Sequence, residues 1–199
     1  GFMHKWRATV NGLEAIAESR NDSLLILDEI GEINPKDAGL AVYMLGNGTG
    51  KRRAGKEGNL RSSKEWRTLF LSSGEVGLAT HLAEENRNIR GGQEVRFIDV
   101  HADQQAGSGI LSYRIEEPSQ FMEQLRRATE TYYGAPIYVF LEKLIEDNQI
   151  AEIVKDCVED LATHVRNLPE GGQVRRVMQR FSLALAAGKL ASQHKILPF

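Results

Sequence analysis

The stretch Leu24-Leu25-Ile26-Leu27-Asp28-Glu29 decides how the rest of the chain is interpreted. An apolar run that ends in two carboxylates is typical of a strand covered on both faces, as in a parallel sheet. Ligands of such sheets bind outside the carboxyl ends of the strands, where an acidic side chain can hold Mg²⁺. We therefore expect a central strand, with Asp28 as the metal ligand and Glu29 as the group that positions an attacking water. A strand that ends in a solvated turn is the alternative.

The flanking segments favour an α/β arrangement. Helical spacing follows Asn11, and Pro35 suits the first turn of a second helix that runs to about Leu45. Residues 66–72 are strongly β-prone, a helix is expected over residues 75–85, and residues 94–100 are expected to form a third strand. Beyond Pro118 the signals are helical, over about 119–133, 137–147, 150–167 and 173–192. We expect an α/β core over residues 1–110, which begins inside a domain, and a helical subdomain over residues 111–199.

Two hydroxyls end the second predicted strand. Ser72 and Ser73 stand where ATPases of the P-loop class with an added catalytic acid place a polar sensor, between the γ-phosphate and the attacking water. The alternative is that Ser-Ser-Gly is turn chemistry ahead of the next helix.

Basic residues concentrate between the first two predicted strands. Residues 48–65 are rich in Gly and Ser, and we expect a hairpin there. Clustered cations on a projecting loop suit contacts to the phosphates of single-stranded or duplex nucleic acid. A solvated loop is the equally weighted alternative. The candidate contacts are Lys51, Arg52, Arg53, Lys56, Arg61 and Lys64.

Further arginines are candidates for contacts to a nucleotide. Arg90 and Arg96 flank the third predicted strand, and either could act as an arginine finger that reaches a neighbouring subunit's nucleotide. Arg175, Arg176 and Arg180 could serve as a lid sensor at the nucleotide. Surface solvation explains each of these residues as well.

Composition excludes several classes of protein. The chain has 199 residues, a formal net charge of -2 and one cysteine, Cys157, so it is not a disulfide scaffold. The histidines are scattered without zinc-ligand spacing, and the longest apolar runs are far shorter than the roughly 20 residues that span a bilayer. We expect a cytoplasmic protein with no membrane segment.

One glycine-rich stretch resembles a phosphate-binding loop only superficially. In Gly46-Asn47-Gly48-Thr49-Gly50-Lys51-Arg52 the glycine spacing is wrong, and Arg52 stands where Ser or Thr must reach Mg²⁺. The sequence contains no true Walker A loop, so the Lys that grips the β- and γ-phosphates is missing.

Several separate motifs occur in a recognisable order along the chain. They are Trp6-Arg7-Ala8-Thr9, Asn11-Gly12-Leu13-Glu14, residues 24–32, Tyr43-Met44-Leu45-Gly46-Asn47-Gly48-Thr49-Gly50-Lys51, residues 66–75, Gly92-Gln93-Glu94-Val95-Arg96, Arg180-Phe181-Ser182-Leu183 and Ala186-Ala187-Gly188. In these motifs the chain resembles the C-terminal part of a bacterial, phage and plasmid family called domain of unknown function nine-two-seven.

Members of that family resemble superfamily III helicases and the helicase halves of primase-helicases, with a P-loop upstream. The resemblance implies an additional-strand P-loop ATPase-like core, here without its Walker A strand, followed by a helical subdomain. It also implies Asp28 and Glu29 as the Walker B pair, Ser72 or Ser73 near sensor one, and a hairpin that touches nucleic acid inside a central channel.

The function we expect is therefore the C-terminal portion of a phage- or plasmid-type helicase-like ATPase, which uses ATP and Mg²⁺ once an upstream P-loop is supplied. A homo-oligomer is the expected assembly, and DNA replication is the expected setting. The alternative is a noncatalytic nucleic-acid-binding or assembly module that keeps the fold and the basic loop.

Overall fold

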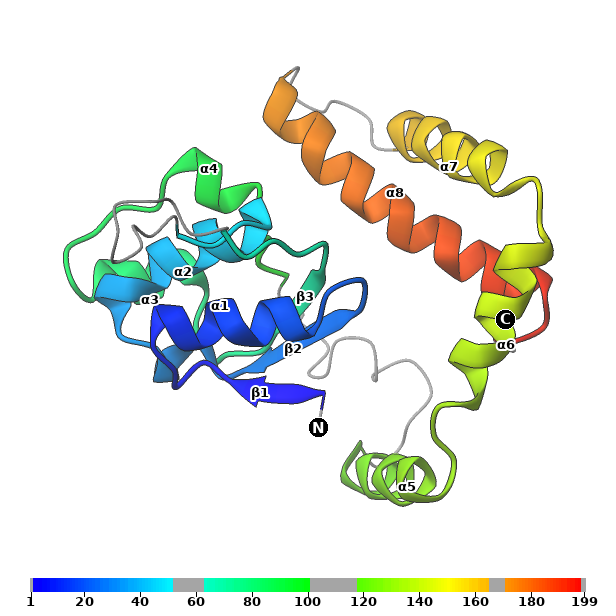
Figure 1. Cartoon of the computed structure of the whole chain (residues 1–199), viewed down its shortest axis with the longest axis horizontal. Coiled ribbons are helices and arrows are strands. Elements are labelled where there is room, and N and C mark those ends of the chain that lie inside the picture. Colours follow the sequence, from blue (N-terminus) through cyan, green and yellow to red (C-terminus); the bar gives the residue numbers. More distant parts are fainter. Residues whose placement is uncertain (1, 52–62, 101–117, 165–170, 198–199) are drawn as a thin grey trace, which may run out of the picture. The chain divides into compact units, whose positions relative to one another are not determined.

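The computed structural model describes residues 2–51, 63–100, 118–164 and 171–197. The chain divides into two compact units, Gly1–Asp99 and Val100–Phe199 (Figure 1). The predicted boundary at residue 110 lies outside the described residues.

A three-stranded parallel sheet organises the first unit. Its strands are β1 (Met3–Lys5), β2 (Leu24–Asp28) and β3 (Leu69–Ser72), in the order β1-β2-β3. Lys5 lies beside Asp28, and Leu27 lies beside Ser72, so the carboxyl ends of all three strands meet at one edge. The predicted central strand is thus confirmed, and the first unit is a mixed α/β structure.

Two long helices connect the strands. The Thr9 hydroxyl accepts from the backbone N–H of Gly12 at the start of α1 (Val10–Ser19), so Thr9 is the capping residue instead of Asn11. α2 (Pro35–Asn47) begins with the predicted proline and ends at Gly48. The shorter elements of this unit are η1 (Ile30–Glu32), α3 (Leu78–Ala83) and α4 (Gly91–Glu94).

The core lies on one side of the sheet. Leu25 and Leu27 of β2 are fully buried with residues of α1 and α2, whereas Leu24 on the opposite face is 43% exposed. The expectation of a strand covered on both faces is therefore wrong for this unit. The physical reason is that β1, β2 and β3 succeed one another in a single direction, so right-handed crossovers place α1 and α2 on the same face.

Residues 94–100 do not form the predicted third strand. α4 ends at Glu94, and the segment that follows carries no strand. Val95 is buried and Phe97 is half-buried on an irregular backbone: the Phe97 ring lies 6.2 Å from the Trp6 ring and 6.0 Å from the Phe70 ring between centroids. The alternation of apolar and polar residues that predicted a strand is therefore explained by packing of these side chains onto the core, without any pairing at the sheet edge.

The second unit is helical, as predicted. Its helices are α5 (Pro118–Thr131), α6 (Ala135–Glu146), α7 (Ile150–His164) and α8 (Gly172–Gln193). α7 and α8 pack together, and they bury Cys157 of α7 together with Ser182 and Ala186 of α8. None of the helices in the described part of the chain is long and apolar enough to span a membrane.

Candidate functional site

The carboxyl edge of the sheet brings together the acidic and hydroxyl residues that the sequence singled out. The Ser73 hydroxyl donates to Asp28 Oδ1 at 2.6 Å and accepts from the backbone N–H of Glu29 at 3.1 Å. This contact joins the end of β2 to the residue that follows β3. The pairing arises because parallel neighbouring strands end at the same edge.

The backbone around Ser73 fixes this contact. The Ser73 N–H donates to the Leu27 carbonyl at 3.1 Å, and the Ile30 N–H donates to the Ser73 carbonyl at 3.0 Å. The hydroxyl carries a single hydrogen, which is directed at Asp28. In this geometry Ser73 orients the Asp28 carboxylate; its predicted role beside a γ-phosphate stays a prediction.

Ser72 points to the covered side of the sheet. Its hydroxyl accepts from the indole Nε1–H of Trp6 at 2.8 Å and donates to the Ser73 carbonyl at 3.2 Å. Trp6 is fully buried, so Ser72 links the strand end to the core. Of the two candidate sensor residues, Ser73 is the one that contacts the carboxylate.

Glu29 occupies an unusual backbone conformation. Its φ of 58° and ψ of 86° lie in the left-handed region, which costs a residue with a Cβ about 1–2 kcal/mol. The Glu29 carboxylate accepts from the Gly31 N–H at 3.0 Å, which supports the tight turn between β2 and η1. A strained, non-glycine residue directly after the central strand marks this turn as a candidate for function.

Lys5 is a member of the site that sequence reasoning missed. It ends β1 beside Asp28, and its Nζ lies 2.9 Å from Glu32 Oε1 and 3.9 Å from Asp28 Oδ2. The hydrogen bond to Glu32, followed by the charges of the nearby carboxylates, raises the pKa of Lys5 above its ordinary value. The sequence predicted no strand before residue 24, so no residue of β1 was expected in the site.

The two arginine-finger candidates differ in their surroundings. The Arg96 guanidinium donates to Asn47 Oδ1 and to the Gly92 carbonyl, each at 2.8 Å, and lies 4.6 Å from the Tyr43 ring centroid. These contacts hold Arg96 against the end of α2. Arg90 is exposed, and its backbone N–H donates to the Gln93 side chain.

The three candidate lid arginines belong to the second unit. Arg175 and Arg176 are exposed in the first turns of α8, and Arg180 is partly buried in the same helix. The carboxylate edge belongs to the first unit.

The basic loop is described only at its flanks. Arg52, Arg53, Lys56 and Arg61 lie outside the described residues. Thr49 and Glu65 form an antiparallel bridge, and the Gly50 N–H donates to the Lys64 carbonyl at 2.8 Å, which is the geometry of a hairpin base. Lys51 is exposed, whereas Lys64 Nζ lies 2.6 Å from Glu18 Oε2.

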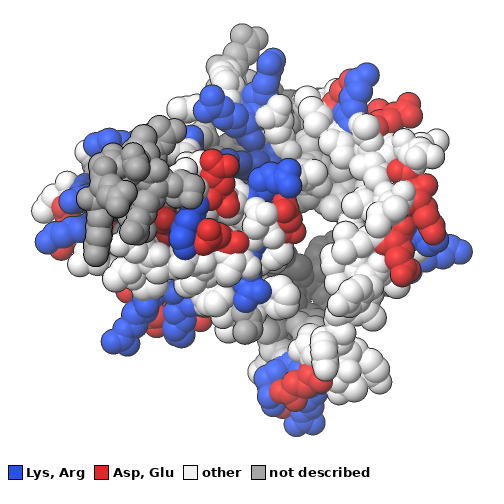
Figure 2. Space-filling model, viewed as in Figure 1, with Lys and Arg blue, Asp and Glu red and all other residues white. Residues whose placement is uncertain are grey.

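Charges of both signs are interspersed over the face of the molecule that Figure 2 shows. Within the part of the chain that the structure describes, no group of three or more His, Cys, Asp and Glu side chains is placed to hold a metal ion. Of the two oxygens of Asp28, the predicted metal ligand, Oδ1 accepts from Ser73 and Oδ2 lies 3.9 Å from the Lys5 ammonium.

A family model matches the N-terminal part of the chain. The model of a family described as "Domain of unknown function (DUF927)" matches residues 1–65. The matched range includes β1, β2, Asp28, Glu29 and α2, and it stops before β3 and its two serines. No curated protein and no solved structure matches the chain. The similarity to this family is thus supported over residues 1–65.

Proposed function

We propose that the first unit carries the Mg²⁺-binding half of an ATP site in a helicase-like ATPase of phage or plasmid type that acts on nucleic acid. The observation that supports this proposal is the Asp28 carboxylate at the carboxyl end of the central parallel strand, oriented by Ser73 from the neighbouring strand. Cytoplasmic DNA replication is the setting that we propose for it.

In this proposal the carboxylates of Asp28 and Glu29 have different roles. Asp28 would hold Mg²⁺ together with the β- and γ-phosphates of ATP, and Glu29 would orient the attacking water. The sequence contains no Walker A loop, so we expect hydrolysis only when a phosphate-binding loop is supplied from elsewhere.

Metal binding tests the first part of the proposal. Mn²⁺ can replace Mg²⁺ as a paramagnetic probe, and it should broaden the amide signals of residues 27–30 and 73. Asp28→Asn should abolish this broadening, while the control Asp37→Asn, which alters an exposed carboxylate of α2, should leave it unchanged. Equal broadening in wild type and Asp28→Asn would remove Asp28 from the site.

Hydrolysis tests the second part. In a longer chain that supplies a phosphate-binding loop, Glu29→Gln should abolish ATP turnover while nucleotide binding persists, because only the group that orients the water is lost. Unchanged turnover would exclude Glu29 from the mechanism.

A noncatalytic nucleic-acid-binding or assembly module is the second candidate. The antiparallel base of the basic loop favours it, because this base sets the two ends of a segment rich in Lys and Arg side by side. Neutralisation of Lys51, Arg52, Arg53 and Lys56 should weaken single-stranded DNA binding and flatten its salt dependence. Neutralisation of Arg126 and Arg127 on α5 is the control. An unchanged salt dependence of DNA binding would show that the loop does not contact phosphates and is merely solvated.

A further inference from the structure

Two helices of the second unit pack closely on no other element in the part of the chain that the structure describes. They are α5 and α6, whereas α7 and α8 pack closely on each other. α5 has 14 residues and α6 has 12, and isolated helices of this length are only marginally stable in water. Both helices therefore need a surface that covers them.

One side of α6 is apolar and exposed. Tyr138, Leu141 and Ile145 follow one another at spacings of three and four residues, so their side chains share one face of the helix. They are 71%, 46% and 84% exposed, and Ile137 beside them is 52% exposed. Glu142 lies at the margin of this face, whereas the ion pair of Lys143 and Glu146 lies away from it.

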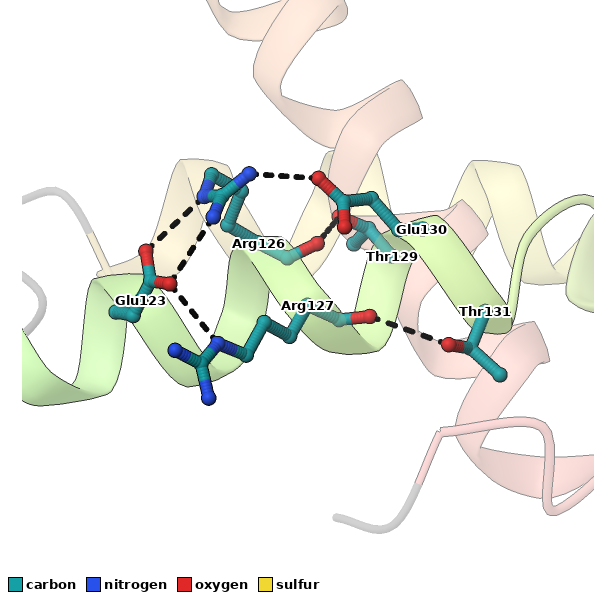
Figure 3. Close-up of polar contacts among 6 residues, drawn as sticks. All are labelled: Glu123, Arg126, Arg127, Thr129, Glu130 and Thr131. Carbon is teal, nitrogen blue, oxygen red and sulfur yellow. Dashed lines mark hydrogen bonds and ion pairs between the residues drawn. The ribbon is translucent and has the colours of Figure 1, made fainter.

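α5 has the same pattern. Met122, Leu125 and Tyr132 lie three and seven residues apart on one face, and they are 50%, 44% and 80% exposed. Tyr132 directly follows the helix, and its N–H still donates to the Ala128 carbonyl at 2.7 Å. The charged side chains of α5 pair with one another along a neighbouring side of the helix (Figure 3).

The exposed apolar area is of the size that a dimer interface needs. With about 150–200 Å² for a whole side chain of these types, the exposed fractions of the residues on the two faces correspond to roughly 600–850 Å² in each copy. A standard interface buries about 800 Å² of each partner, whereas the largest apolar patch of a typical monomer measures about 300–600 Å². The residues on the two faces are Met122, Leu125, Tyr132, Ile137, Tyr138, Leu141 and Ile145.

We propose that a second copy of this chain covers these faces, so that α5 and α6 of two copies form one two-fold interface. In a two-fold pair the same surface of both copies takes part, and helices with spacings of three and four apolar residues pack ridges into grooves.

The charges of the two helices favour this occupant. The cations Arg126, Arg127 and Lys143 are each paired with a carboxylate of their own helix, so two identical faces meet without repulsion between like charges. A nucleic acid would instead need cations that are available for its phosphates.

Sedimentation equilibrium of the full chain tests the interface. β3 also exposes an apolar residue, Leu71, so the measurements are made in a Leu71→Lys background, which opposes association through that strand. Leu141→Lys should raise the dissociation constant of the pair at least about tenfold, because each pair loses two buried leucines and gains two charges. The matched control is Val139→Lys: Val139 is 43% exposed on the same helix, on the side of Lys143 and Glu146, and its change should leave the constant as it is.

Amide hydrogen exchange gives a local measurement that a substitution without an effect on the interface would not move. The amides of residues 138–145 should become more protected as concentration rises, and this gain should be lost in Leu141→Lys. The amides of α7 and α8, which pack on each other, should stay unchanged and report that the variant is folded.

The remaining outcomes would overturn the proposal. Equal dissociation constants in Leu141→Lys and Val139→Lys would show that the apolar face of α6 is not in the interface. A monomer at all concentrations would exclude the pair, and protected amides in α6 would then show that a single copy covers the face. None of these measurements depends on a nucleotide or a metal ion, so their failure leaves the proposed function untouched.

Discussion

At the scale of single residues, one hydrogen bond couples the end of β3 to the core. The Trp6 indole is fully buried, its Nε1–H donates to the Ser72 hydroxyl at 2.8 Å, and its ring packs edge-on against Phe97. A buried indole N–H needs an acceptor, so Ser72 is required for stability whatever its part in chemistry.

Ser72→Ala should lower the free energy of unfolding by about 1–3 kcal/mol, because it leaves the Trp6 N–H unpaired. In a Trp6→Phe background the same change should cost less, since no indole donor remains. Urea unfolding followed by tryptophan fluorescence measures this double-mutant cycle through Trp66. Thr80→Ala, at an exposed position of α3, is the control and should stay within about 0.5 kcal/mol. An equal cost of Ser72→Ala in both backgrounds would contradict the coupling.

At the scale of elements, two glycines in or beside long helices differ in whether their positions tolerate a side chain. Gly48 ends α2 with a φ of 72°, and a Cβ there would lie 2.5 Å from the Trp66 carbonyl oxygen. Gly188 lies inside α8, and a Cβ there would meet nothing within 4 Å.

Gly48→Ala should therefore destabilise the first unit by at least about 1 kcal/mol, whereas Gly188→Ala should stabilise α8 by roughly 0.5–1 kcal/mol. Amide hydrogen exchange in α2 and α8 reports the two effects separately. A stabilising Gly48→Ala would show that the left-handed end of α2 is not needed.

The charged face of α5 should respond to acid (Figure 3). Glu123 accepts from Arg126 at 3.0 Å and from Arg127 at 2.9 Å, and these bonds, Arg126 first, lower the pKa of Glu123. A lowered pKa stabilises the helix above the ordinary value of 4.5, and this contribution is lost as pH falls through the lower folded value. Carboxyl NMR titration should place Glu123 below 4.5, and Arg126→Gln should raise its midpoint. An unshifted midpoint would show that the pairs do not persist in solution.

Sequence predicted the elements with strong local signals. Pro35 marks the start of α2, and the run that ends in Asp28 predicted β2 almost to the residue. β1 was missed because Met3-His4-Lys5 has no apolar run. The segment that follows α4 was mistaken for a strand because Val95 and Phe97 alternate with polar residues. The contact of Ser73 with Asp28 could be predicted, because parallel neighbouring strands end at the same edge. The position of Lys5 depends on the strand register, and the left-handed conformation of Glu29 depends on a backbone dihedral angle. Neither leaves a pattern in the sequence.

At the scale of the whole first unit, the residues that the structure describes cover the sheet on one side only. Leu69 and Leu71 of β3 are 55% and 60% exposed, and the register places them beside Leu24 and Ile26 on the uncovered face. Within the described residues β3 pairs with β2 alone, so its other edge offers backbone donors and acceptors. Parallel sheets are normally covered on both faces, and an apolar open edge attracts further strands.

We therefore expect the isolated chain to associate with a second copy through β3 and its exposed leucines. Light scattering should give an apparent mass that rises with concentration, and Leu71→Lys should reduce this rise, because a charge at an edge strand opposes pairing. The control is Leu40→Lys, which changes an apolar residue of α2 that is 48% exposed, and it should leave association unchanged. Hydrogen exchange adds the local measurement: the amides of Leu69–Ser72 should become protected as concentration rises. A monomer at all concentrations, with these amides already protected, would show that the edge of β3 is covered within a single chain.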